Sequence, residues 1–93
     1  MPTNKLDSMF ADLEKLVTSK SGISASDAEK VDIESACKEV LLLKIIANKR
    51  AKIQEGSLSG NLGLTRFMGD WNFDKDIEDL GYRIEELYRS TNP

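Results

Sequence analysis

The chain has 93 residues, 40% of them hydrophobic and 31% charged, with a formal net charge of −3. This length and composition predict one soluble globular domain over residues 1–93 and argue against a disordered chain. The small negative charge disfavours a dedicated nucleic-acid binder. The longest apolar run is far shorter than the roughly 20 residues of a membrane-spanning helix, and residues 1–10 resemble neither a secretory signal nor a transit peptide.

The residue types present also limit the chemistry. The chain contains no histidine, which removes the usual general base and the commonest metal ligand. Cys37 is the single cysteine, so an intramolecular disulfide and a structural zinc site are both excluded. We expect Cys37 to be a small buried residue on an apolar helical face. These features predict a cytoplasmic protein without a cofactor and without a metal ion.

Apolar residues at helical spacing predict a first helix over about residues 4–20. Asn4 can cap its start, and Gly22 can end it in the left-handed conformation. The apolar stripe follows the i, i+3, i+4, i+7 pattern and consists of Leu6, Met9, Phe10, Leu13, Leu16 and Val17. A helix with one such stripe packs that side against a neighbour.

A second, longer helix is predicted over about residues 24–55, which contain neither Gly nor Pro. Two overlapping capping patterns mark its start, because Ser26 with Glu29 and Ser24 with Asp27 both fit. An uninterrupted helix of this length would be a rod of roughly 45 Å.

Residues 40–46, with the sequence VLLLKII, are apolar around most of the helix circumference. Such a helix must be enclosed by neighbours. We therefore predict that the second helix is the centre of the assembly, covered by other helices of the chain, by a second subunit, or by both. Gly56 is its predicted end.

The third helix is predicted over about residues 73–90, with an acidic first part that complements the helix dipole. Gly81 lies in its middle, beside the apolar stripe. Because Gly costs about 1 kcal/mol relative to Ala inside a helix, close approach of another helix backbone is the expected reason for it. Eight residues are expected in the core: Leu13, Leu16, Val40, Leu43, Ile46, Ile77, Leu80 and Ile84.

Residues 56–72 combine glycines with large apolar side chains, unlike a flexible solvated linker. We predict an ordered loop with a short helical turn over residues 62–68. Its side chains either close the open end of the bundle or dock a partner, because aromatic residues, Met and Arg are typical of interaction surfaces. The candidate partner-binding residues are Leu64, Phe67, Met68 and Trp71, with the nearby cations Lys49, Arg50, Lys52 and Arg66.

The basic end of the second helix has two interpretations. It can contact nucleic acid, although few phosphate contacts are available, or it can pair with the acidic start of the third helix. The acidic residues likewise leave a weaker alternative, a carboxylate and magnesium-dependent enzyme. Glu85 and Glu86 lack a second acidic pair for such a site, and helix-dipole complementarity explains the acids near Asp74.

The sequence therefore predicts an all-α fold, a small bundle of three main helices, and a non-catalytic protein–protein interaction module. An adaptor, a chaperone or a regulator would all fit. The first alternative is a nucleic-acid-associated accessory factor. We also expect a homodimer, because residues on a second face of the long helix are left over as a seam: Val31, Leu42, Ile45 and Ile53. No membrane role is expected, since none of the three helices is basic and amphipathic.

Overall fold

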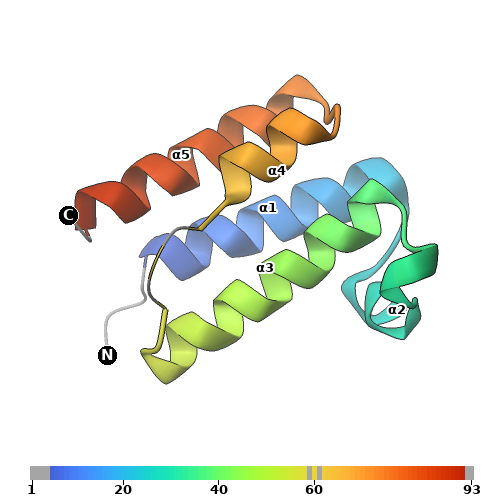
Figure 1. The fold of residues 1–93 in the computed structure, drawn as a ribbon, viewed down its shortest axis with the longest axis horizontal. Helices are drawn as coiled ribbons and strands as arrows, with labels where there is room; N and C mark the ends of the chain where they lie inside the picture. Colours follow the sequence, from blue (N-terminus) through green and yellow to red (C-terminus); the bar gives the residue numbers. More distant parts are fainter. Residues whose placement is uncertain (1–4, 59, 61, 92–93) are drawn as a thin grey trace.

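The chain folds into five α-helices and one short 3-10 helix in a computed structural model that describes residues 5–58, 60 and 62–91 (Figure 1). In chain order these are α1 (Lys5–Ser21), α2 (Ala25–Lys30), η1 (Ile33–Ser35, the 3-10 helix), α3 (Lys38–Glu55), α4 (Leu64–Asp70) and α5 (Lys75–Thr91). The predicted all-α class is confirmed. Asn4, the expected cap of the first helix, lies outside the described residues.

Helix α1 lies between α3 and α5 and packs against both (Figure 1). It runs antiparallel to these two neighbours, which run in the same direction as each other. Its fully or nearly buried side chains recur every three or four residues and are Leu6, Phe10, Leu13 and Val17. The expectation that the second helix is the central one is therefore wrong, because the helix with a single narrow stripe occupies the middle position.

The predicted helix over residues 24–55 is divided into α2, η1 and α3, which corrects the expectation of one long rod. Val31 and Asp32 between α2 and η1, and Ala36 and Cys37 between η1 and α3, have extended backbone. β-Branched residues, Asp, Ser and Cys are weaker helix formers than Leu or Lys, and they are concentrated here. Gly and Pro are thus not needed to interrupt the helix.

The interruption brings α2 against α3, where Ala28 is buried. A continuous helix of roughly 45 Å would exceed the longest dimension of the molecule, which is 34 Å. The start of α2 is capped by Ser24, whose hydroxyl accepts a hydrogen bond from the backbone N–H of Asp27 at 3.1 Å. The earlier of the two predicted capping patterns is the one used.

The start of α3 also differs from the sequence prediction at Cys37. This residue is the N-cap of α3 and is exposed, so the expectation of a buried thiol on a helical face is wrong. The helix ends as predicted at Gly56, which is left-handed with φ 73°. There the N–H of Ser57 donates to the carbonyl of Lys52 at 2.9 Å, which completes a Schellman-type end.

The core joins all three main helices to the segment around α4. Six of the eight predicted core residues are buried, namely Leu13, Val40, Leu43, Ile46, Ile77 and Ile84, while Leu16 and Leu80 are half-buried at its edge. Leu42 is also fully buried, so it cannot belong to a seam with a second copy. Leu62, Leu64 and Met68 close the core from the α4 side.

Helix α4 contains most of the short helical turn predicted over residues 62–68, and it packs on α5. Its first backbone N–H, that of Leu64, donates to a carboxylate oxygen of Glu85 at 3.2 Å. Gly63, the N-cap residue, has no side chain that could do this. Glu85 is buried and also pairs with Arg89 at 3.3 Å. This buried carboxylate therefore serves as the cap of α4.

Gly81 lies where α5 meets α4. A Cβ atom at this position would overlap the sulfur of Met68 and lie 2.6 Å from its methyl carbon. Met68 is itself buried, so its side chain has little room to withdraw. The expectation that a helix backbone approaches Gly81 is therefore wrong, because the groups that approach it are side chains of α4.

Replacing Gly81 by Ala should destabilise the fold by about 1–3 kcal/mol, because the new methyl group overpacks this contact. The matched control is Gly69→Ala in α4, which meets nothing within 4 Å and should be neutral or stabilising by up to about 1 kcal/mol. In a Met68→Ala background the penalty at Gly81 should disappear. Urea unfolding of the four variants measures this coupling, and equal penalties in both backgrounds would contradict it.

Glu85 and its neighbour Glu86 provide a second comparison. Glu85→Ala leaves the N-terminus of α4 without its cap and should lower the free energy of unfolding by about 1–3 kcal/mol. Glu86 is exposed, and Glu86→Ala should change the same quantity by less than about 0.5 kcal/mol. Thermal and urea unfolding monitored by circular dichroism test this, and similar effects at both positions would argue against the capping role.

Candidate functional site: an apolar groove between α3 and α4

The apolar residues predicted to bind a partner are divided between the core and the surface. Leu64 and Met68 are buried, Phe67 is half-buried and Trp71 is 43% exposed. Arg66 is exposed beside them on α4. The helical spacing of α4 explains this division, since Leu64 and Met68 are four residues apart and face α5 together. Only Phe67, Trp71 and Arg66 of this set present surface to a partner.

The basic residues predicted with them also differ, because one of them is paired with carboxylates inside the fold and, in the described ranges, the others are not. Arg50 donates to Asp7 at 3.1 Å and to Glu14 at 3.2 Å, both on α1. The hydrogen bond that Arg50 donates to Asp7 is the largest cause that raises the pKa of the guanidinium above its usual value, and Glu14 adds to it. Lys49 is half-buried and Lys52 is exposed. Arg50 is therefore engaged within the fold.

One interpretation of the sequence expected the acidic start of the third helix to pair with the basic end of the second. Among the described residues, no such ion pair forms. Lys20 of α1 instead contacts Asp74 at 3.3 Å and Asp76 at 3.5 Å. The antiparallel course of α1 explains both findings. It places the carboxylates of its first half beside the basic half of α3, and its basic end beside the acidic start of α5.

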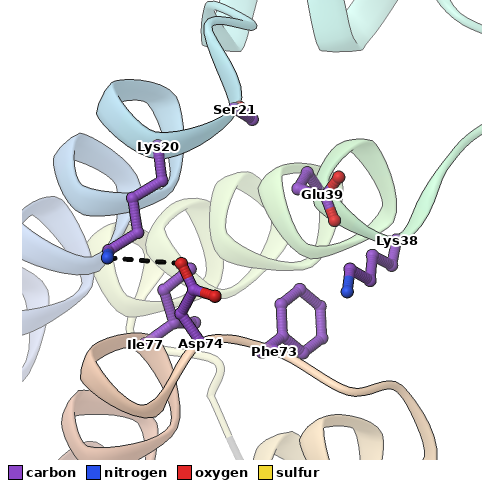
Figure 2. A pocket seen from close by; sticks show the side chains of 7 residues that line it. All are labelled: Lys20, Ser21, Lys38, Glu39, Phe73, Asp74 and Ile77. Atoms are coloured by element: carbon purple, nitrogen blue, oxygen red, sulfur yellow. Dashed lines mark ion pairs between the residues drawn. The ribbon is translucent and has the colours of Figure 1, made fainter.

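A charged pocket of about 200 Å³ lies where the end of α1 meets the starts of α3 and α5 (Figure 2). Lys20 reaches across it toward Asp74, and Lys38 lies beside the ring of Phe73, 5.4 Å from its centroid. Lys38 also donates to the carbonyl of Asn72. Both cations are already engaged by neighbouring groups of the fold. We therefore interpret this pocket as a junction between helices and not as a binding site for a charged ligand.

Two further details describe the electrostatics of this junction. The hydrogen bond with Asp74 is the largest cause that raises the pKa of Lys20, and the charges of Asp74 and Asp76 act in the same direction. On the other side of the pocket, one carboxylate oxygen of Glu39 is buried and has no hydrogen-bond partner among the described residues. Glu39 is in the first turn of α3, where the helix dipole favours a negative charge.

A more apolar hollow of about 330 Å³ lies on the other face of α3, and we call it the α3–α4 groove. Nine residues line it: Ile33, Leu41, Lys44, Ile45, Asn48, Lys49, Leu62, Gly63 and Phe67. One wall comes from α3, the opposite wall from Leu62 to Phe67, and Ile33 of η1 lies at one end. Sequence analysis named Phe67 and Lys49 of this set as partner-binding residues and Ile45 as part of a dimer seam. It did not assign Ile33, Leu41 or Leu62 to any site.

The spacing of residues along α3 explains how the groove arises. Leu42 and Ile46 are buried, whereas Leu41 and Ile45 are turned to the groove and remain half-buried. The apolar run from Val40 to Ile46 thus supplies two different faces of one helix. The first face is enclosed by the fold, and the second is covered only in part. Ile33 is 70% exposed at the end of this second face.

Charges of opposite sign occupy the two ends of the groove. At the η1 end, an adjoining hollow is lined by the acidic residues Glu29, Asp32 and Glu34, together with Lys44. At the other end, Lys49 lines the groove, and Lys52 follows it one turn later on α3. Among the described residues, neither lysine forms an ion pair of the kind that Arg50 forms.

Aromatic rings support the α4 wall of the groove. The ring centroid of Phe67 lies 6.1 Å from that of Trp71 and 5.7 Å from that of Phe73, both in tilted arrangements. Aromatic pairs with centroids at such separations add about 0.5–1.5 kcal/mol per pair beyond the burial of area. Contacts with Phe73 and Trp71 therefore fix the position of the Phe67 ring. Trp71 also extends the apolar surface outside the groove.

Other kinds of site were sought in the part of the chain that the structure describes. Within residues 5–58, 60 and 62–91, no group of three or more Asp, Glu or Cys side chains is arranged to hold a metal ion. None of the helices in these ranges is long and apolar enough to cross a membrane. Comparison of the chain with protein-family models, with curated proteins and with solved structures gives no match.

The ion pairs of Arg50 yield a test with a built-in control. Arg50→Met should lower the free energy of unfolding by about 1 kcal/mol, since two partly buried carboxylates lose their partner, and part of this is screened by solvent. The loss should shrink at about 1 M salt, where the Debye length is about 3 Å. Lys52→Met, on the exposed side of the same helix, should have almost no effect. A salt-independent loss at Arg50 would show that packing of its aliphatic stem dominates.

Proposed function

We propose that this protein is a cytoplasmic, non-catalytic interaction module that binds another polypeptide in the α3–α4 groove. The observation that carries the proposal is the second apolar face of α3. Leu41 and Ile45 lie on it half-buried, and Ile33 at its end is 70% exposed. Exposed large apolar residues that gather around a hollow are typical of protein interaction sites.

The dimensions of the groove favour a polypeptide as its ligand. From Leu41 to Lys49, α3 advances about 12 Å, which corresponds to roughly two helical turns. A helix laid in such a groove would place apolar residues at i and i+4 or i+7 against Leu41, Ile45 and Phe67. Lys44 and Lys49 at the rim would then contact polar residues of the ligand.

The surface near the groove also supports an adaptor or regulator role. Trp71 lies outside the groove-lining set, next to Phe67, and is 43% exposed. Tryptophan is enriched among residues that dominate binding energy. The exposed thiol of Cys37 fits the proposed cytoplasmic location, because a reducing compartment keeps such a thiol from pairing between chains.

Nucleic-acid binding is the second candidate, and one observation favours it. Lys49, Lys52 and Arg66 have no ion-pair partner among the described residues, in contrast to Arg50. Three such cations would give few phosphate contacts. If they do bind nucleic acid, the affinity for a fluorescent single-stranded oligonucleotide should fall steeply between about 50 and 200 mM salt.

Site-specific photo-crosslinking in the native host tests the proposal. A photoreactive amino acid is placed at Ile33, at Trp71 or, as a control, at Tyr82, which is 47% exposed on α5. All three side chains are exposed, and we expect the fold to tolerate the change at each position. We expect crosslinked polypeptides from the Ile33 position, or from both Ile33 and Trp71, and a much lower yield from Tyr82.

Two results would count against the proposal. Equal yields of the same products from Ile33 and Tyr82 would indicate contacts without a preferred surface. Products from Tyr82 alone would place the binding surface on α5. Crosslinks from Trp71 that consist of nucleic acid, together with the steep salt dependence described above, would favour the second candidate instead.

A further inference from the structure

We propose that the polypeptide bound in the α3–α4 groove is a second copy of this chain, paired antiparallel along α3. This inference rests on the proposed function, because it names the occupant of the same groove. It uses an observation that the proposal of a binding groove does not need, namely the charge pattern along the groove.

The charge pattern is mainly acidic at one end, where Lys44 also lines the adjoining hollow, and basic at the other. Asp32 and Glu34 are exposed at the η1 end, and Lys49 and Lys52 occupy the opposite end. A twofold rotation about an axis through the middle of the groove exchanges these ends. It places the acidic end of each copy beside the basic end of the other, so the surface is complementary to itself. A symmetric dimer interface requires this property.

The apolar middle of the groove fits the same arrangement. Leu41 and Ile45 lie four residues apart on one stripe of α3, with Ile33 at the acidic end and Phe67 on the facing wall. In an antiparallel pair the half-covered stripes of the two copies meet near the axis. Each exposed Ile33 side chain then lies at the edge of the partner's groove, where its apolar surface is removed from water.

The small size of the protein favours a weak dimer. Standard interfaces cover about one tenth of a small protein's surface, which for a total of 6034 Å² is about 600 Å² per copy. Two such faces bury about 1,200 Å², the lower end of the range for specific interfaces. We therefore expect dissociation in the micromolar range. Trp71 lies outside the groove and remains exposed in this dimer for a different partner.

Sedimentation equilibrium of the purified chain is the first test, over about 5–500 µM. The apparent mass should rise from 10.4 kDa toward twice that value. Ile33→Ser should weaken the association at least about tenfold, and the control Tyr82→Ser should not, although both remove exposed apolar surface. A 10.4 kDa species over the whole range would overturn the inference.

Charge reversal provides a sharper test. The acid-ended variant Lys49→Glu/Lys52→Glu has acidic groups at both ends of the groove, and the base-ended variant Asp32→Lys/Glu34→Lys has basic groups at both. Each alone should associate at least about tenfold more weakly than the wild type, because like charges meet. An equimolar mixture should restore association, since acidic ends again meet basic ends.

The control for the reversal is Lys75→Glu/Arg83→Glu on α5, where both residues are exposed. It changes the net charge by the same amount as the acid-ended variant and should leave association unchanged. If it weakens association equally, or if the mixture fails to restore it, pairing along the groove is excluded.

These outcomes are distinct from those of the proposed function. A purified chain that stays monomeric, combined with crosslinks from Ile33 to an unrelated polypeptide in the host, removes the second copy as occupant and leaves the binding groove intact. A dimer in solution whose Ile33 crosslinks consist of the chain itself supports both. A dimer whose association is unchanged by Ile33→Ser and by the charge reversals overturns the present inference and leaves the proposed function standing.

Discussion

The antiparallel course of α1 between α3 and α5 is the constraint on which the rest of the structure depends. It brings the buried stripe of α1 against both neighbours. It also places Asp7 and Glu14 beside Arg50, and Lys20 beside Asp74. The ion pairs on the two sides of α1 therefore both follow from its antiparallel packing against α3 and α5. Because α1 covers only one face of α3, the opposite face is left to Phe67 and Leu62, which cover it in part.

The sequence was most informative where a single structural rule applied. The stripe of α1 follows helical spacing, and Gly22 and Gly56 end their helices with positive φ angles, so these features could be predicted. The division of residues 24–55 could not, because it results from several weak preferences between Val31 and Cys37 together with the burial of Ala28. No single residue in that stretch forbids a helix.

The candidate site shows the same distinction. The sequence placed Leu64, Phe67, Met68 and Trp71 in one group of candidate binding residues, but Leu64 and Met68 are in the core. Only the position of α5 decides which side of α4 is buried. Likewise, Arg50 and Lys52 look equivalent in sequence, and the course of α1 determines that only the former is engaged by carboxylates. Ile33 was missed because its exposure follows from the break before α3.

The contact between Met68 and Gly81 has an evolutionary consequence. The two positions share one small volume, in which the methionine side chain occupies the place of a glycine Cβ atom. The two positions are coupled: a larger residue at position 81 requires the end of the Met68 side chain to shift or a shorter residue at position 68. Related sequences should therefore vary at these two positions together, with a long side chain at one and a hydrogen atom at the other. Such paired variation would identify the α4–α5 contact in distantly related sequences, even where the apolar residues of the helices have been replaced.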